Sequence, residues 1–294
     1  MNNTVAVIGG SGLLGSEMVR VLETEGWMVV APSHGELDIL DSEKVTHFFA
    51  NCSPAYVINT AAYIDVDACE SDPVPAWHIN ALGAGNVARA LWQNKRTETK
   101  LIHMSTNYVF GESKKQYGED DLPDPVNVYG ETKKVGEELV QAYCVMGNIP
   151  YSIIRTSWLY SSLRDTYVDA VAKTLLRGEV FRASSTQFGN LTSADDLARA
   201  IVAVCMQPGL PSNKYHLVNS GGDTKEGMSR YDIAVHIADC LGISLSMVEN
   251  GENPAPGIAP RPKHAVLLNT KTPPLPSWKE SLTRYVQAKH NRRE

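Results

Sequence analysis

The chain of 294 residues is poor in cysteine and has no long hydrophobic run. Its five cysteines are odd in number, widely spaced and without a C-x-x-C pair, which excludes a disulfide-stapled scaffold and predicts reduced, mostly buried thiols. No apolar run approaches the ~18 residues that a membrane helix needs, and the first residues lack the basic segment of a signal peptide. We therefore expect a cytoplasmic protein that does not engage a membrane.

The sequence also contains fewer positively than negatively charged residues. Lys and Arg number 27 against 33 Asp and Glu, so the net charge is −6 and the basic surface that nucleic-acid binders need is absent. The eight histidines form no H-x-x-x-H pair and there is no G-x-S-x-G motif, which leaves a zinc site and a nucleophilic hydrolase without support. We expect no nucleic-acid partner and no obligatory metal.

Short apolar runs alternate with segments of helical periodicity in the first half of the chain. The pattern predicts strands and helices in turn over 4–8, 13–25, 27–31, 41–50, 56–59, 75–93, 101–105, 129–146 and 151–155. Gly26 stands where a helix C-cap glycine belongs, and Asp41 where an N-cap belongs. The alternation predicts an α/β fold, a Rossmann-type doubly wound parallel sheet covered on both faces.

The alternation loosens after Ser157. We expect a helix, a strand, a helix and a strand over 166–177, 180–183, 194–206 and 215–218. The predicted domains are an NAD(P)-binding domain over 1–155, to which a segment near 186–220 returns, and a smaller C-terminal substrate-binding domain built mainly from 156–294. The proline-rich stretch 250–262 predicts a loop lining a site, and the charge run 289–294 predicts a frayed end.

A glycine-rich loop lies directly between the first predicted strand and the first predicted helix. Glycines there let the chain turn tightly and let the amides at the start of the helix approach a phosphate without a Cβ in the way. We predict that this loop binds a dinucleotide pyrophosphate; the alternative is a tight turn without a ligand. The cofactor-binding candidates are Gly9, Gly12, Leu13, Leu14 and Gly15.

The tip of the second predicted strand bears on the choice of cofactor. An acidic side chain there would bind the ribose hydroxyls of NAD, but no carboxylate occurs before Glu36. Ser33 and His34 can instead donate hydrogen bonds to a 2′-phosphate. The tip therefore favours NADPH, with NADH tolerated, although these residues could also make only a turn.

Three side chains are candidates for carbonyl chemistry. Tyr129 and Lys133 are four residues apart, and thus neighbours on one helix face. A phenol with a pKa near 10 can donate a proton to a carbonyl oxygen, and a nearby cation stabilises the phenolate. Such a pair is common on solvated helices, but Thr106 adds a hydroxyl at the carboxyl end of the fourth predicted strand. Together they predict a catalytic trio.

These motifs resemble the extended short-chain dehydrogenase/reductase superfamily. Within it, five segments are similar to the dTDP-4-dehydrorhamnose reductase family, and the similarity spans residue 5 to about 270. The segments are the glycine loop, Glu36 to Asp41, Asn59 to Glu70, Ser105 to Phe110 with Asn127 to Lys133, and Arg155 to Tyr160.

The resemblance implies NADPH-dependent reduction of the C4 ketone of a nucleotide-linked 6-deoxysugar, dTDP-4-dehydrorhamnose to dTDP-L-rhamnose, for cell-surface polysaccharide or deoxysugar biosynthesis. It also implies a homodimer. It assigns Thr106, Tyr129 and Lys133 to catalysis. It further places the adenine beside Asp38 and Ile39, the nicotinamide beside Ala61, Ala62 and Tyr63, and the substrate beside Asn107, Tyr108, Trp158 and Arg261.

Some positions depart from the family pattern and leave the sugar and the base open. Asn107 replaces an expected aspartate, and Thr186, Leu191 and Asn269 depart as well. Two alternatives therefore remain. One is another nucleotide-sugar epimerase or reductase of the superfamily, with a dehydratase ranking last. The other is a non-catalytic NADP-binding regulatory subunit resembling that of methionine adenosyltransferase.

Overall fold

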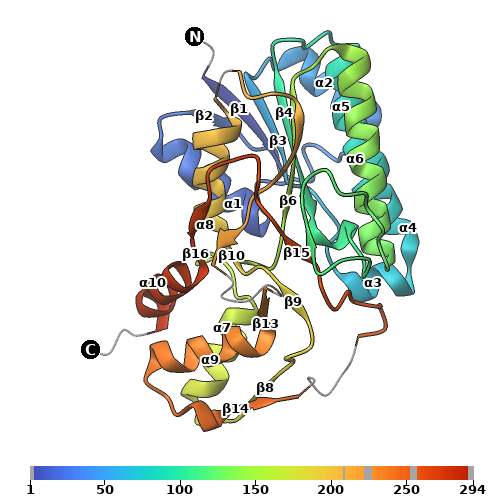
Figure 1. Ribbon diagram of the computed structural model, residues 1–294. Coiled ribbons are helices and arrows are strands. Elements are labelled where there is room, and N and C mark those ends of the chain that lie inside the picture. The colour runs from blue at the N-terminus through green and yellow to red at the C-terminus, as the bar shows by residue number, and fades with distance from the viewer. Residues whose placement is uncertain (1–2, 208, 222–226, 252–256, 291–294) are drawn as a thin grey trace.

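A six-stranded parallel sheet forms the centre of the structure, a computed structural model that describes residues 3–207, 209–221, 227–251 and 257–290 (Figure 1). The strand order is β11-β6-β4-β3-β1-β2. The strands are β1 (Thr4–Ile8), β2 (Met28–Val30), β3 (Tyr56–Asn59), β4 (Lys100–Thr106), β6 (Tyr151–Thr156) and β11 (Asn213–His216). The α/β class and the doubly wound parallel sheet predicted from the sequence are confirmed.

The order of the strands fixes where a ligand can bind. From β1 the chain moves outward to β2, then returns to the other side of β1 and continues through β3, β4 and β6. The direction of winding thus reverses between β1 and β3. Ligands of open α/β sheets bind at the carboxyl ends of the strands beside such a reversal. Every residue of β4 and of β6 is buried, as expected for central strands of a sheet that is covered on both faces.

Helices cover both faces of the sheet (Figure 1). On one face α1 (Leu13–Thr24) packs against α8 (Ala194–Ala200) and the π-helical turn Ile201–Cys205. On the other lie α2 (Ser42–Asn51), α5 (Ala84–Gln93) and α6 (Val128–Gly147). The side chain of Asp41 accepts a hydrogen bond from the Lys44 amide, and Gly26 has a φ of +81°, so the predicted helix ends are present.

The helix predicted over 75–93 is present, with a π-helical stretch inside it. It consists of α4 (Pro73–Ala76), a π-helical turn (Trp77–Gly83) and α5, preceded by the short α3 (Val66–Ser71). Within the wide turn, the Asn80 side chain bonds both the amide and the carbonyl of Tyr63, at 2.8 and 2.9 Å. The Asn80 carbonyl lies so close to Gly136 of α6 that a Cβ there would clash with it. The turn is therefore shaped by tertiary contacts that periodicity does not reveal.

The C-terminal lobe lies at the bottom of Figure 1 and is mainly helical. Its core joins α7 (Tyr167–Leu176), α9 (Arg230–Leu241) and α10 (Trp278–His290) to the paired strands β8 (Phe181–Ala183) and β14 (Val248–Asn250). Sequence reasoning did not anticipate α9 or α10. The remaining short elements are the 3₁₀ turns Asn107–Val109 and Leu245–Met247 and the strands β5 (Gln116–Tyr117), β7 (Leu159–Tyr160), β9 (Phe188–Gly189), β10 (Thr192–Ser193), β12 (Asn219–Ser220), β13 (Met228–Ser229), β15 (Val266–Leu267) and β16 (Leu275–Ser277).

Two predictions for this half need correction. The strand expected over 215–218 occupies 213–216, where it joins β6 at the edge of the sheet. The charge run 289–294 begins inside α10 rather than in a frayed end, because Lys289 and His290 contact the buried carboxylate of Asp169 at 2.8 and 3.0 Å. Part of the predicted loop 250–262, residues 252–256, lies outside the described residues, as do 291–294.

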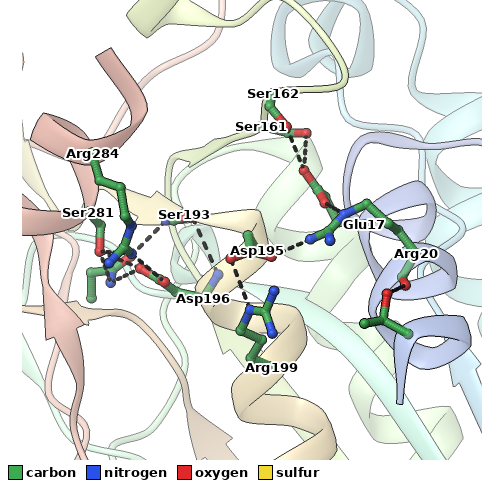
Figure 2. Close-up of polar contacts among 12 residues, drawn as sticks. Glu17, Arg20, Ser161, Ser162, Ser193, Asp195, Asp196, Arg199, Ser281 and Arg284 are labelled. Carbon is green, nitrogen blue, oxygen red and sulfur yellow. Dashed lines mark hydrogen bonds and ion pairs between the residues drawn. The ribbon is translucent and has the colours of Figure 1, made fainter. Parts of the chain in front are cut away.

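Polar contacts hold the C-terminal elements to the first lobe (Figure 2). The buried Glu17 of α1 accepts a hydrogen bond from the Ser161 hydroxyl at 2.9 Å, and, within the first lobe, Arg20 pairs with Asp195 of α8. Asp196 of α8 accepts hydrogen bonds from Ser281 and Arg284 of α10. Charged side chains thus contribute to the junction between the lobes.

The cysteines agree with the expectation of reduced, mostly buried thiols. All five cysteines are free thiols, and Cys69, Cys144 and Cys205 are buried. Among the described residues, no helix is long and apolar enough to cross a bilayer.

Candidate active site

A cavity of about 310 Å³ opens at the carboxyl ends of β1, β3, β4 and β6, beside the reversal of strand order. It brings together the glycine loop, the predicted trio and Trp158, which come from four separate parts of the sequence. Its lining residues are Gly12, Leu13, Leu14, Thr60, Ala62, Ile64, Met104, Ser105, Thr106, Tyr129, Lys133, Thr156, Ser157, Trp158 and Leu159.

The glycine loop forms one wall of the cavity and has the shape that a pyrophosphate requires. Gly9 has a φ of +80°, and a Cβ there would come within 2.7 Å of the Ala61 amide nitrogen. A Cβ on Gly15 would clash with the carbonyl oxygen of Gly9. Gly12 caps α1 and supplies no side-chain hydrogen bond, so the first amides of the helix stay open to an anion. The residues present fit a dinucleotide.

Tyr129 lies in the first turn of α6, opposite the end of β4. Asn127 caps this helix by accepting a hydrogen bond from the Gly130 amide at 2.8 Å. Burial raises the pKa of Tyr129 to about 12, and the hydroxyl of Thr106 opposes this shift. The phenol is therefore protonated at neutral pH and is available as a proton donor.

Lys133 lies one helical turn after Tyr129 and is only 2% exposed. Its Nζ donates a hydrogen bond to the Met104 carbonyl oxygen of β4 at 2.7 Å. Burial lowers the pKa of Lys133 to about 8, and the carboxylate of Glu137 opposes this shift. A cation in a poorly hydrated position stabilises negative charge on a neighbouring oxygen more than it would in water.

Glu137 is a supporting residue that sequence reasoning missed. It lies one further turn along α6, is 1% exposed, and accepts hydrogen bonds from Arg155 Nε at 2.8 Å and Arg155 Nη2 at 2.7 Å. The Ser105 hydroxyl donates to it at 2.6 Å. This buried pair joins α6, β4 and β6 directly behind the trio. The regular spacing of Tyr129, Lys133 and Glu137 by four residues could have indicated it.

Trp158 is held in an unusual conformation on the far wall of the cavity. Its φ is +38°, which is costly for a residue with a Cβ and is found mainly at functional sites. A Cβ on Gly189 would come within 2.9 Å of the indole ring, so only glycine leaves room for the ring there. The Arg230 guanidinium lies over the indole at 4.1 Å from the ring centroid.

The predicted adenine side of the cofactor lies away from this cavity, after β2. Ser33 and His34 are exposed, but both the amide and the hydroxyl of Ser33 donate to the Glu36 carboxylate, each at 2.8 Å. Asp38 accepts a hydrogen bond from the Leu40 amide at 2.9 Å, and the Ile39 side chain lies against Gly83. The carboxylate of Glu36, three residues further along the chain, thus lies directly beside Ser33.

Residues that follow β3 also line the cavity. The Ala61 amide donates to the Asn59 side chain at 3.2 Å, and Ala62 lines the cavity. The Asn80 side chain fixes the backbone of Tyr63 through two hydrogen bonds. Of the three predicted nicotinamide-side residues, Ala61 lies against Gly9 of the glycine loop and Ala62 lines the cavity.

The remaining predicted substrate residues occupy different positions. The Asn107 amide group is buried and donates to the Ala265 carbonyl oxygen at 2.9 Å, which ties β4 to the C-terminal segment. The Tyr108 ring meets the Tyr129 ring edge-on at 5.9 Å. Arg261 makes a two-pronged ion pair with Asp67 at 3.0 and 2.7 Å, and this pairing lowers the pKa of Asp67 to about 2.

The described residues contain no group of three or more His, Cys, Asp or Glu side chains that could hold a metal ion. The absence of an obligatory metal stays a prediction.

The whole chain matches one family model. The model described as the RmlD substrate binding domain matches residues 3–291. The chain belongs to this family. The match confirms the family resemblance and, with it, the predicted class of oxidoreductase.

Relatives and solved structures agree with this assignment. The chain is 31% identical over 297 residues to the dTDP-4-dehydrorhamnose reductase of Mycolicibacterium smegmatis, covering 98% of this chain and 86% of that protein. It is 32% identical over 288 residues to the spore coat polysaccharide biosynthesis protein SpsK of Bacillus subtilis, covering 96% of each. The crystal structure of dTDP-4-dehydrorhamnose reductase from Bacillus anthracis in complex with NADP superimposes with a TM-score of 0.87 at 28% identity, covering 98% of this chain and 100% of that one.

Proposed function

We propose that this family member is an NADPH-dependent reductase of the C4 ketone of a nucleotide-linked 4-keto-6-deoxyhexose. The proposed reaction converts dTDP-4-dehydrorhamnose to dTDP-L-rhamnose, for cell-surface polysaccharide or deoxysugar biosynthesis. One observation carries the proposal: Thr106, Tyr129 and Lys133 line a single cavity together with the glycine loop and Trp158. The relatives named for this reaction, and the neighbour crystallised with NADP, support it.

Thr106, Tyr129 and Lys133 together deliver the proton that the reduction requires. When bound, NADPH supplies the hydride that reduces the ketone carbon. Tyr129, protonated at neutral pH, donates the phenolic proton to the ketone oxygen, which becomes a hydroxyl. The Thr106 hydroxyl bonds the same oxygen before transfer, and the Lys133 ammonium stabilises the phenolate left behind. Lys133 also holds the nicotinamide ribose.

The cavity walls position the two ligands. The first amides of α1 and the Cβ-free surface of Gly9, Gly12 and Gly15 would hold the cofactor pyrophosphate, with the adenine beside Asp38 and Ile39. Ala61, Ala62 and Tyr63 would border the nicotinamide. The sugar would lie against Trp158 and Tyr108, on the side that carries the departures from the family pattern.

The preference for NADPH over NADH rests on Ser33 and His34. In the structure the donors of Ser33 are held by Glu36, so a 2′-phosphate would have to displace this carboxylate. We propose that NADPH binds with Ser33 turned toward its phosphate, and that NADH is tolerated.

A coupled assay tests the proposal. The protein is incubated with NADPH and dTDP-4-keto-6-deoxyglucose, with and without a 3,5-epimerase, and NADPH absorbance is followed. We expect NADPH oxidation only when the epimerase is present. Epimerisation or dehydration of the sugar without net NADPH consumption would favour another activity of the superfamily. NADPH binding without turnover on either sugar would favour the non-catalytic regulatory subunit.

We further propose that the protein works in the cytoplasm, where nucleotide sugars are made, and that it forms a homodimer. Both follow from the family resemblance and composition. The expectation of no nucleic-acid partner stays a prediction.

A further inference from the structure

Arg230, the first residue of α9, is a cation that sequence reasoning did not single out. Its guanidinium lies between two aromatic rings, at 4.1 Å from the centroid of Trp158 and 4.5 Å from that of Tyr167. The Tyr167 hydroxyl also bonds the Arg230 carbonyl oxygen at 3.0 Å. The two rings hold the planar group in one orientation, which lowers the entropy lost when its nitrogens bind a ligand.

The charge of Arg230 is unmatched. Across the described ranges 3–207, 209–221, 227–251 and 257–290, no carboxylate pairs with its guanidinium, whereas Arg155, Arg20, Arg261 and Arg284 each have one. Burial and the guanidinium of Arg261 both lower the pKa of Arg230. The residue is partly exposed, so an anionic ligand can reach the guanidinium and supply the missing partner.

The location points to a substrate rather than to the cofactor. Trp158, over which Arg230 lies, lines the cavity of Tyr129 and Lys133. Tyr108 acts on the pKa of both Tyr129 and Arg230, and it packs edge-on against Tyr129. Arg230 is therefore near the reacting centre but on the C-terminal side of it, while the glycine loop for the cofactor is on the opposite wall.

We propose that Arg230 binds the diphosphate group of the nucleotide-linked sugar. This inference rests on the proposed function, which supplies a substrate with that group. A guanidinium matches phosphate oxygens with two parallel N–H donors, and contacts with ring faces do not use these in-plane donors. Arg261, which sequence reasoning assigned to phosphate, already has two of its nitrogens on Asp67. Arg230 thus supplies the main positive charge for the diphosphate.

Calorimetric titration of the full chain, saturated with NADP, tests this. The probe is dTDP, and thymidine, followed by ligand-observed NMR, is the probe without phosphates. We expect Arg230→Gln to weaken dTDP binding at least about tenfold, the loss of a charge-assisted hydrogen-bond pair, and to leave thymidine binding unchanged. Arg261→Gln should weaken dTDP binding less. The matched control Arg177→Gln removes an exposed arginine of the same lobe, paired with Glu179, and should change neither.

Arg230→Lys is a second variant, for the case that Arg230→Gln is unstable. It retains the charge but loses the planar fork, so dTDP binding should weaken by about threefold or more. Unchanged dTDP affinity in a folded Arg230 variant would overturn the inference. Equal loss of dTDP and thymidine would also overturn it, since that is the result of a purely structural stack.

The assay also separates this inference from the proposed reaction. If dTDP binding depends on Arg230 but no sugar is reduced, the inference stands and the proposed reduction fails. If the wild-type protein binds no dTDP, both the inference and the nucleotide part of the proposed function fail.

Discussion

The interiors of the two lobes are built differently. In the first lobe, the fully buried strands β4 and β6 and close-packed glycines fix the backbone around the glycine loop and the trio. In the C-terminal lobe the sheet pairings are only two strands wide, and side-chain contacts connect the helices: an apolar core joins α7, α9 and α10, and Asp169 of α7 accepts a hydrogen bond from Tyr285 of α10. A substitution that disturbs closely packed backbone affects the whole region, whereas a single side-chain contact can be replaced without moving the backbone. We therefore expect the catalytic chemistry to depend on the first lobe and the choice of substrate on the second.

The largest effect is expected at the centre of the first lobe. Tyr129→Phe removes the proton donor and should lower kcat by at least about 10², with NADPH affinity little changed. Steady-state kinetics and a cofactor titration measure both values. Turnover at the wild-type rate would refute the role of Tyr129.

The glycine loop offers a test of backbone packing. Gly15→Ala places a Cβ against the Gly9 carbonyl oxygen, so we expect a loss of stability of about 1–3 kcal/mol and a strong loss of NADPH binding. Gly35→Ala is the matched control, since a Cβ there meets nothing within 4 Å. Denaturant unfolding and cofactor titration give the comparison. Equal behaviour of the two variants would contradict a tightly packed loop.

The pH dependence of Lys133 should show opposite signs for activity and stability. Its pKa is about 8 in the folded protein against an ordinary value of 10.5, so its charge is lost as pH rises through about 8. We expect kcat/KM for NADPH to fall by up to about tenfold per pH unit above 8. Between about 8 and 10.5 the unfolded chain binds more protons at this residue, so its contribution to stability rises with pH. Lys133→Met should lack that rise.

The junction between α8 and α10 of the C-terminal lobe should respond to the loss of a single side-chain acceptor. Asp196 accepts hydrogen bonds from Asn219 at 2.8 Å and Arg284 at 3.0 Å and is 6% exposed. We expect Asp196→Asn to cost about 1–3 kcal/mol of unfolding free energy while the hydride step is preserved. Asp120→Asn, at an exposed pair with Lys271, should cost less than about 0.5 kcal/mol. A kcat loss as large as that of the Tyr129 variant would erase the distinction between the lobes.

The smallest effect concerns the choice of cofactor. Glu36→Gln frees Ser33 and removes a negative charge beside the 2′-position. The ratio of kcat/KM values for NADPH and NADH should rise a few-fold, about the worth of one exposed charge interaction. A fall in this ratio would show that Glu36 supports NADPH binding instead.

The sequence is more informative about the first lobe than about the second. The glycine loop, the apolar strands and the spacing of Tyr129 and Lys133 carry local patterns, and all were found. The helix α9 was missed although Ser229 and Asp232 form a capping box and Gly242 follows its end with a φ of +66°. The π-helical turn at Asn80 and the unmatched charge of Arg230 depend on contacts with distant segments, which no local pattern contains.

Transfer of deuterium tests the central claim most directly. NADPH carrying deuterium at the transferred position of its nicotinamide is incubated with the epimerised dTDP-4-keto sugar, and the product is examined by NMR. The account predicts deuterium at C4 of a dTDP-6-deoxysugar with the wild-type protein and almost none with Tyr129→Phe. Deuterium at another carbon, or none in any product while the cofactor is bound, would contradict it.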